Sequence, residues 1–266
     1  MILRPLSFEE ISKIFDDQAK SVIEYYLFKA IISQPELVTG QNKLPIQIPK
    51  EHVEQWGVQS LGLESIGAGS YPIDLVAKDK SFGADIKMLS WSGGNKMSGE
   101  TSLGQKFENS ELDMLFDTRQ FEKIINTWKE ILNTKFENVF KRYNQLKKIY
   151  YFIFIREFKK FHICAMEVNT KNFNIMKLSK SSAKSVWVDN FLEKDYGQIK
   201  IYKSKKRMEL RLKPKKWISR KHTSSFNMED LPSISRDIKI LSTKDRYDLY
   251  LDDVKKIYKS CCNYES

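Results

Sequence analysis

The sequence predicts an α/β fold in which helices flank a mixed β-sheet. Residues 7–32 and 118–148 carry apolar side chains at helical spacing. Residues 149–156 form a nearly continuous apolar run, which is typical of a central strand that is buried on both faces. With 266 residues and 41% hydrophobic content, the chain is long enough to bury this core within one domain spanning residues 1–266.

The first helix is expected to begin at Ser7, because Ser7 can cap it and Glu10 stands at the capping-box position. Its apolar stripe continues to about Ile32. A polar connection over residues 34–50 follows, and residues 51–60 are expected to form a short helix.

Two short strands joined by a polar turn are expected between residues 72 and 89. The first strand carries Asp74, and the second carries Asp85 and Lys87. Strand side chains alternate between faces, so Asp85 and Lys87 point the same way, about 7 Å apart. Pairing of the strands brings Asp74 near Asp85. Two carboxylates held together repel one another, and a hard divalent cation such as Mg²⁺ removes that repulsion.

This hairpin contains Pro72-Ile73-Asp74, then ten residues, then Asp85-Ile86-Lys87. The pattern resembles the PD-(D/E)xK nuclease superfamily, to which many type II restriction endonucleases belong, and the resemblance covers roughly residues 64–89. It implies a restriction-endonuclease-like fold in which the two aspartates, together with Ile86, bind Mg²⁺. The lysine would position or activate the attacking water. Ile73 separates the proline from the first acid, a variation that is common in the family.

Two glutamates are further candidates for this site. In the family that the hairpin resembles, a helix before the hairpin often supplies another acid, and Glu24 is the candidate here for a catalytic role. Glu64 precedes the hairpin and could also approach the metal. The spacing of Asp237 and Lys239 matches that of Asp85 and Lys87, but no strand bearing an acid after a proline precedes them.

A glycine- and serine-rich stretch over residues 90–105 is expected to be a long loop that leaves the strand carrying Lys87. Its backbone amides, its hydroxyls and Lys96 suit contacts to phosphate groups or base edges of DNA. The alternative is a surface loop without such a role.

The rest of the chain is expected to add further strands and helices. Strands are predicted at 161–168 and 173–178, a helix at 181–193, a hairpin at 198–202 and 208–212, and a helix at 246–258.

Basic residues are concentrated between Ile199 and Lys221, a segment that holds eleven of the 45 lysines and arginines and one acid, Glu209. Its net charge of +10 nearly equals the +11 of the whole chain, and such a surface suggests a polyanionic partner. A β-ribbon with a basic face can sit in a DNA groove, so the hairpin and loop at about 198–225 are expected to bind DNA. The alternative is a solvated sheet edge protected by lysines. The residues expected to contact DNA here are Arg211, Lys213, Lys215, Lys216, Arg220 and Lys221.

Other features narrow the class of protein. The sequence has no apolar run near 18 residues and an acidic stretch soon after the N-terminus, so neither a membrane span nor a signal peptide is expected. Its three cysteines show no paired spacing, which argues against a disulfide framework or a zinc site and fits the cytoplasm. The three histidines lie in unrelated settings.

The expected function is therefore that of a Mg²⁺-dependent type II restriction endonuclease that hydrolyses phosphodiester bonds in double-stranded DNA. A homodimer is expected, because a symmetric site cut on both strands needs two hydrolytic centres. One alternative is a related nuclease acting in defence, repair or junction resolution. Another is a non-catalytic nucleic-acid-binding module.

Overall fold

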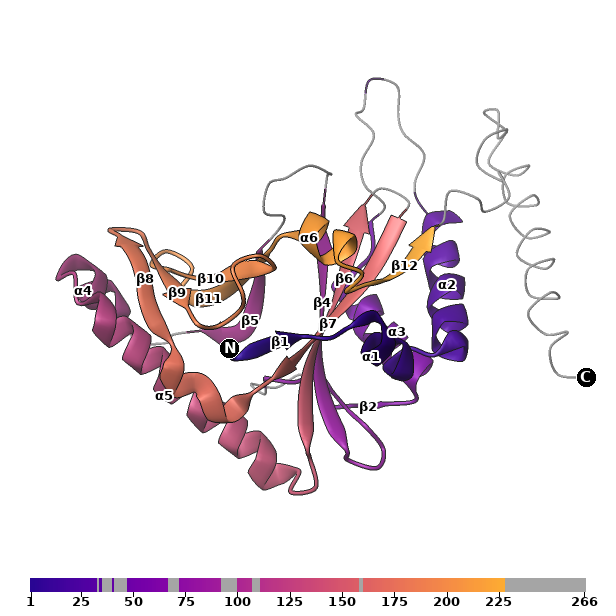
Figure 1. Cartoon of the computed structure of the whole chain (residues 1–266), viewed down its shortest axis with the longest axis horizontal. Coiled ribbons are helices and arrows are strands. Elements are labelled where there is room, and N and C mark those ends of the chain that lie inside the picture. Colours follow the sequence, from indigo (N-terminus) through magenta and orange to yellow (C-terminus); the bar gives the residue numbers. More distant parts are fainter. Residues whose placement is uncertain are drawn as a thin grey trace, which may run out of the picture. The chain divides into compact units, whose positions relative to one another are not determined.

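The computed structural model describes residues 1–32, 34, 40, 47–66, 72–91, 100–106, 111–157 and 160–227. The chain divides into two units, Met1–Glu229 and Asp230–Ser266, and all of the described residues lie in the first. This unit is a mixed α/β fold, and its described strands form two sheets (Figure 1). The predicted helix at 246–258 lies outside the described residues.

The first sheet is mixed, as the sequence predicts. Its described strands follow the order β1 (Leu3–Pro5), β7 (Lys160–Val168), β6 (Lys148–Glu157), β4 (Phe82–Ser90), β3 (Leu75–Val76) and β2 (Glu64–Ser65), and β12 (Ser224–Asn227) also pairs with β7. The pair β4–β6 is parallel and the other described pairs are antiparallel. The predicted strands at 149–156 and 161–168 and the predicted pairing of the hairpin between residues 72 and 89 are therefore confirmed. The first strand of the hairpin is shorter than predicted, because β3 begins one residue after Asp74.

Strand β6 lies at the centre of this sheet because its side chains are apolar on both faces. Tyr151 and Ile153 belong to the core that the sheet shares with the second sheet and α5 (Phe121–Arg142). On the opposite face, the ring of Phe152 packs edge-on against Phe15, with their centroids 5.0 Å apart. A strand buried on both sides fixes the position of the strands that pair with it.

The predicted helix over residues 7–32 is wrong in one respect, because the structure has two helices there. Helix α1 (Phe8–Ile14) begins with the predicted capping box. Ser7 N–H donates to Glu10 Oε2 over 2.9 Å, and Glu10 N–H donates to Ser7 Oγ over 3.3 Å. A second cap then begins α2 (Asp17–Ile32), where Asp16 Oδ1 accepts the N–H of Ala19 over 2.8 Å. The side chain of Asp16 thus competes with a continuous helix.

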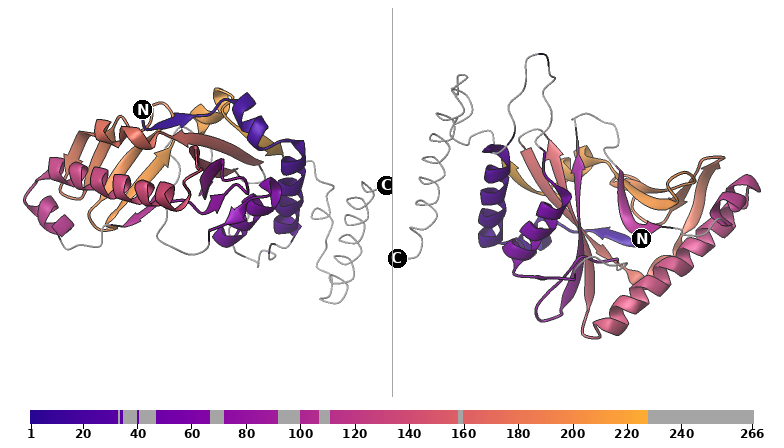
Figure 2. Two further views of the ribbon diagram at one scale, coloured as in Figure 1. Left: turned by 90° about the horizontal axis from the view of Figure 1, so that it is seen from below. Right: turned by 180° about the vertical axis from the view of Figure 1, so that it is seen from behind.

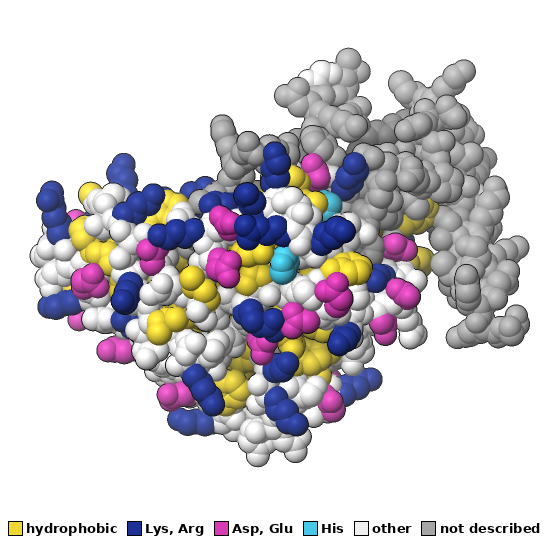
Figure 3. Space-filling view, in the orientation of Figure 1, with side chains coloured by type: hydrophobic (Ala, Val, Ile, Leu, Met, Phe, Trp, Pro, Cys, Tyr) yellow, Lys and Arg dark blue, Asp and Glu magenta, His cyan; other side chains and the backbone are white. Residues whose placement is uncertain are grey.

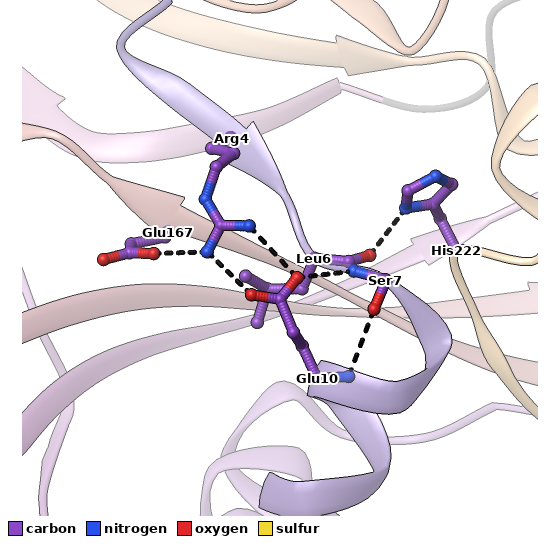
Figure 4. A network of polar contacts seen from close by, with 6 residues as sticks. All are labelled: Arg4, Leu6, Ser7, Glu10, Glu167 and His222. Atoms are coloured by element: carbon purple, nitrogen blue, oxygen red, sulfur yellow. Dashed lines mark hydrogen bonds and ion pairs between the residues drawn. The ribbon is translucent and has the colours of Figure 1, made fainter.

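Hydrogen bonds tie the N-terminal segment to both the first sheet and α6 (Pro214–Ser219) (Figure 4). Arg4 makes a two-pronged contact with Glu10, at 2.9 and 3.0 Å, and also contacts Glu167 on β7, so the pKa of Arg4 is raised. His222, which follows α6, has its Nδ1 2.7 Å from the carbonyl oxygen of Leu6. Because a carbonyl oxygen only accepts, this nitrogen carries the proton.

The second sheet is antiparallel and was not predicted as a separate layer. Its described strands follow the order β5 (Glu100–Lys106), β11 (Arg207–Leu212), β10 (Gly197–Tyr202), β9 (Ser185–Asp189) and β8 (Lys177–Ser182). Helix α4 (Glu111–Asp117) and helix α5 contribute to the same core as one face of this sheet, and α5 crosses that face in Figure 2. The opposite face of the sheet is polar.

Three local predictions in this region are wrong, because tertiary pairing decided the structure. Residues 170–175 form a 3₁₀ helix instead of the start of a strand at 173–178. The predicted helix at 181–193 is replaced by the hairpin of β8 and β9, in which buried Val186 and Val188 flank half-buried Trp187 with a period of two. The predicted loop at 90–105 ends early, because β5 pairs with β11 from residue 100 onward.

The basic loop predicted after Lys213 is also partly wrong. Pro214 begins the short helix α6, a position where its missing N–H costs nothing. Trp217 on this helix is fully buried, and its indole N–H donates to the carbonyl of Tyr196 over 2.8 Å. This anchor holds α6 against the second sheet.

Helix α5 confirms the helical spacing seen over residues 118–148, and its apolar side chains are buried inside the chain. Ile124, Trp128, Leu132 and Phe136 are each at most 2% exposed within the shared core. This stripe is therefore not available as a dimer contact. Among the described helices, none combines the length and the apolar character needed to cross a membrane.

Helix α3 (Lys50–Leu61) confirms the predicted helix at 51–60 and supports β4 from the face opposite Asp85. The support is close, because a Cβ atom added at Gly57 would lie 2.1 Å from Cδ1 of Ile86 and 3.1 Å from Cδ1 of Leu75. Ile86 is itself only 1% exposed. The absence of a side chain at residue 57 thus lets α3 approach the strand that carries the site.

This contact predicts a coupling between two substitutions. Gly57→Ala overpacks the interface between α3 and β4, which lowers the free energy of unfolding by about 1–3 kcal/mol. The higher helix propensity of alanine offsets about 1 kcal/mol of this loss. Ile86→Val alone is expected to cost about 0.5–1.5 kcal/mol, but in the Gly57→Ala background it removes the clashing Cδ1 and should not destabilise further. Denaturant unfolding of the four proteins measures the coupling, and strictly additive free energies would contradict the described packing.

Candidate functional site

Backbone hydrogen bonds fix Asp74 beside β4. Asp74 lies one residue before β3, where its N–H donates to the carbonyl of Ala84 over 2.9 Å. Its own carbonyl accepts the N–H of Ile66, also over 2.9 Å. The residue is thus held on both sides by neighbouring backbone, and its side chain is directed toward the strand that carries Asp85 and Lys87.

The three predicted residues of the hairpin come together. Lys87 Nζ contacts Asp85 Oδ1 and lies 3.3 Å from Asp74 Oδ2. The same oxygen of Asp74 accepts the N–H of Ile86 over 3.3 Å. The side chain of Asp85 is 6% exposed and that of Asp74 is 27% exposed, so the site opens to solvent on the side of Asp74.

Burial and charge drive the acidities of the two aspartates apart. Burial raises the pKa of Asp85 well above its usual value, and the neighbouring charge of Asp74 adds to this effect, although Lys87 opposes it. Burial would also raise the pKa of Asp74, but the hydrogen bond with Asp85 and the charge of Lys87 outweigh it, so the pKa is lowered. Asp74 therefore ionises first, and Asp85 binds a proton more readily.

The lysine stays protonated in this setting. Burial alone would lower the pKa of Lys87, but the charges of Asp85 and Asp74 outweigh burial, and the pKa is raised. Such a lysine is a hydrogen-bond donor and a positive charge held at a fixed place. It does not act as a base near neutral pH.

Tyr151 belongs to the surroundings of this cluster and was missed as a site residue. It lies beside Asp85 in the β4–β6 register and is 2% exposed. Burial, together with the charges of Asp85 and Asp74, raises the pKa of its phenol well above the usual value. The only sequence signal for Tyr151 was its hydroxyl group within an apolar run, and the simpler interpretation of such a residue is that it belongs to the hydrophobic core.

The other predicted acids do not join the cluster. Glu24 is exposed on α2, and Glu64 is exposed on β2, where it pairs with Lys80. In the part of the chain that the structure describes, no group of three or more His, Cys, Asp or Glu side chains could hold a metal ion. The donors at hand are thus two carboxylates and neighbouring backbone.

These donors suit a hard cation such as Mg²⁺. Both carboxylates converge on the ammonium of Lys87, so the site already favours positive charge. The N–H of Ile86 points toward Asp74, and in an extended strand the carbonyl of the same residue points to the same side. Because the side chain of Ile86 is buried and apolar, its carbonyl oxygen is the only metal ligand that this residue offers.

The histidines lie elsewhere. His52 is exposed on α3, and His222 contacts the carbonyl of Leu6. His162 is a strand residue, as predicted, with Nδ1 2.7 Å from Ser225 Oγ and Nε2 3.6 Å from Glu157. Burial lowers the pKa of His162.

The predicted basic ribbon is not a free hairpin. Strands β10 and β11 form the predicted hairpin, but β9 pairs with one and β5 with the other. Glu209, the one acid of the basic segment, is only 3% exposed and pairs with Lys205 over 3.1 Å. A ribbon with neighbours on both edges cannot insert into a DNA groove as two isolated strands would.

The basic segment separates into groups in the structure. One group, here called the α6 basic cluster, consists of Lys213, Lys215, Lys216, Arg220 and Lys221. Arg220 pairs with Asp195 and lies 5.2 Å from the ring of Tyr196. Two other lysines are paired with acids on α4, Lys203 with Asp117 at 2.5 Å and Lys206 with Asp113 at 3.0 Å.

Arg211 lies apart from the α6 basic cluster, on the polar face of the second sheet. Lys96 lies outside the described residues. Figure 3 shows lysine and arginine side chains gathered over the second sheet and around α6. The excess charge is thus spread over two surfaces instead of one ribbon.

Comparisons with known proteins give no assignment. No protein-family model matches the chain, and neither a curated protein nor a solved structure matches it.

The buried carboxyl of Asp85 predicts a gain in stability on its removal. Asp85→Asn should raise the free energy of unfolding at pH 8 by about 0.5–2 kcal/mol, which is a few degrees in Tm, because it removes a buried negative charge beside Asp74. The folded pKa of Asp85 lies above its unfolded value, so the ionised form costs stability at high pH. This cost disappears as the pH falls through the raised pKa toward 3.8, and the gain should shrink with it.

Thermal unfolding from pH 8 to pH 5 measures this difference, with and without Mg²⁺. Mg²⁺ should raise the Tm of the wild type and have a much smaller effect on Asp85→Asn. A variant that is less stable than the wild type at pH 8 would show that Asp85 is a net stabilising partner of Lys87.

Proposed function

We propose that this chain is a Mg²⁺-dependent endonuclease of the PD-(D/E)xK type that hydrolyses phosphodiester bonds in double-stranded DNA. The observation that carries the proposal is the meeting of Asp74, Asp85 and Lys87 on one face of the β3–β4 hairpin. The motif spacing alone could arise by chance in a charged chain. The meeting of two aspartates and a lysine at a point that is partly open to solvent supports a catalytic role, because such a group can bind a cation and stabilise developing charge.

The surrounding topology supports a restriction-endonuclease-like fold. Strand β3 pairs antiparallel with β4, and β4 pairs in parallel with β6. Helices α4 and α5 lie between β4 and β6 in the chain, and a parallel pair requires such a long connection. This arrangement of strands presents one face of β4 for chemistry while α3 packs on the other.

Asp74, Asp85 and the carbonyl of Ile86 would hold the metal. When bound, Mg²⁺ would lower the pKa of a water ligand and stabilise the charge that develops on the phosphate. The protonated Lys87 would donate a hydrogen bond to the attacking water or to the phosphate oxygen, and its position is fixed by both aspartates. Asp74, the more exposed and more acidic of the two, would face the incoming substrate.

Substitution of the cluster tests this proposal. Asp74→Ala, Asp85→Asn and Lys87→Ala are each expected to abolish cleavage of plasmid DNA in Mg²⁺ while duplex binding stays within about threefold, because the α6 basic cluster is untouched. Asp79→Asn is the matched control, since Asp79 is an exposed acid in the turn of the same hairpin.

The pattern of products separates related functions. Discrete bands indicate a sequence-specific enzyme, and progressive degradation indicates a less specific nuclease with the same chemistry. Wild-type rates in any of the three cluster variants would remove that residue from the mechanism. A wild-type protein that binds DNA but never cuts it would favour a non-catalytic binding module.

We also propose that the enzyme acts as a homodimer on DNA. Two hydrolytic centres related by a two-fold axis suit a symmetric site that is cut on both strands. Sedimentation of the full chain in Ca²⁺, with a duplex that the wild type cleaves in Mg²⁺, is expected to give a complex with two chains per duplex. A stoichiometry of one chain per duplex in this experiment would refute the dimer.

A further inference from the structure

The polar face of the second sheet carries a continuous group of aromatic and basic side chains. On β10, half-buried Lys200 and Tyr202 alternate with fully buried Ile199 and Ile201. The register places Lys180 of β8 opposite Trp187 of β9, and Trp187 opposite Lys200. We call the following group the aromatic–basic face: Lys180, Trp187, Lys200, Tyr202, Lys205 and Arg211.

The cations of this group lie against its aromatic rings. Lys180 and Lys200 lie 4.6 and 4.8 Å from the ring centroid of Trp187, and the Arg211 guanidinium lies 5.9 Å from it. Lys200 also lies 4.3 Å from the centroid of Tyr202, and Lys205 lies 4.8 Å from it. Each such contact is favourable, because the electron-rich face of the ring attracts a cation.

These contacts order side chains that are usually mobile. A lysine or arginine loses rotamer entropy when it is immobilised, and the binding interaction normally has to offset this loss. Here the rings already restrict the charged groups before any partner arrives. An array of ordered charges is the property that a binding surface needs and that a merely solvated sheet edge does not.

The face carries more basic than acidic residues. Its four cations are accompanied by two acids: Glu209, which is 3% exposed, bonded to Lys205 and opposite Lys200 in the register, and Glu100, which the register places opposite Arg211. The charged groups of Lys180, Lys200 and Arg211 lie 4.6, 4.8 and 5.9 Å from one ring centroid, that of Trp187, so they form a compact cluster. Successive phosphates of one DNA strand rise about 3.4 Å along the duplex axis, so a cluster of this size can face neighbouring phosphates of one strand.

We propose that the aromatic–basic face binds the phosphate backbone of double-stranded DNA. The proposal rests on the proposed nuclease function for the identity of the polyanion, and it extends that function with a binding surface outside both the carboxylate cluster and the α6 basic cluster. The sheet that carries this face is joined to the site, because its edge strand β5 follows β4 in the chain and contacts it. DNA held on this face would thus be held by a layer connected directly to the strand of Asp85 and Lys87.

The test is a salt series of duplex binding by the full chain in EDTA, read by fluorescence anisotropy. In Lys180→Thr/Lys200→Thr the log–log slope should fall by up to about 1.8, since each lost phosphate contact removes about 0.9. At 0.15 M salt this corresponds to an affinity about 30-fold weaker, taking 1 M salt as the reference. Threonine keeps the strand propensity of both positions, and unchanged thermal unfolding establishes that the variant is folded.

A second variant separates the ring from the charges. Trp187→Leu keeps all four basic residues but removes the ring that orders three of them. The affinity for the duplex should therefore fall at least threefold, while the log–log salt slope stays that of the wild type. An affinity equal to that of the wild type would overturn the ordering role of the ring.

The matched control is Lys123→Gln/Lys141→Gln, which removes two exposed lysines from α5, the helix on the opposite side of the second sheet. Its slope and affinity should equal those of the wild type. An equal loss in this control would show that only the total charge matters and would overturn the proposed face. So would a wild-type slope in Lys180→Thr/Lys200→Thr, or preferential binding of polyglutamate, which would indicate an acidic protein partner.

The outcomes also separate this proposal from the nuclease proposal, because binding in EDTA requires no cleavage. If the wild type cuts DNA in Mg²⁺ but the lysine variant binds normally, the face is refuted and the nuclease stands. If the wild type never cuts DNA but binding depends on the face, the nuclease is refuted and the face stands.

Discussion

The parallel pairing of β4 with β6 is the interaction on which the rest of the structure depends. The two strands stay in register from Phe82 opposite Lys148 to Ser90 opposite Arg156. Because β4 lies inside the sheet, its backbone is fixed by β6 along its length and by β3 near its start. One face packs on α3, and the other presents Asp85 and Lys87. Side chains on such a strand are held more rigidly than side chains on loops. This rigidity suits a site whose geometry must be kept.

Burial of Asp85 inside the protein makes its ionised form unfavourable. Asp85 faces the interior with a second carboxylate and one ammonium group as neighbours, so its ionised form is disfavoured. Lys87 reduces this cost but cannot satisfy two carboxylates as a divalent cation could. The two carboxylates thus repel one another, although the backbone that carries them is held rigidly by sheet pairing. Such a local conflict is typical of functional sites, since packing alone would select apolar residues at the same positions.

The basic residues show how folding redistributes charge. Along the chain, residues 199–221 form one positive block, but in the structure the block turns back on itself through β10, β11 and α6. Some of its lysines face acids on α4, others lie on the aromatic rings of the second sheet, and the rest surround α6. The indole of Trp217 is hydrogen-bonded to Tyr196 beneath α6, while Trp187 and Tyr202 contact the cations of the sheet face. The positions of these aromatic residues in the fold could not be read from composition.

Local sequence was sufficient for features that depend on neighbours in the chain. The capping box at Ser7, the central strand over residues 149–156 and the meeting of Asp74 with Asp85 all follow from short-range pattern, since a tight hairpin has few ways to pair. The second sheet could not be foreseen in this way. Strand β5 is polar and glycine-containing, and it is a strand because β11 offers it hydrogen bonds. The apolar pattern of residues 181–193 is too short to exclude a helix. The strand conformation follows from the pairing of β9 with β8 and β10.

The sequence by itself thus determined the mixed α/β class, the strands β4, β6 and β7 and the three residues of the candidate site, because each depends on local periodicity and on one hairpin. Only the tertiary structure decided that Glu24 and Glu64 stay out of the site, that Tyr151 lies beside Asp85, and that the basic hairpin is the middle of a sheet. These outcomes depend on contacts between residues far apart in the chain. Their free energy comes from burial and from hydrogen bonding with partners that no local window contains.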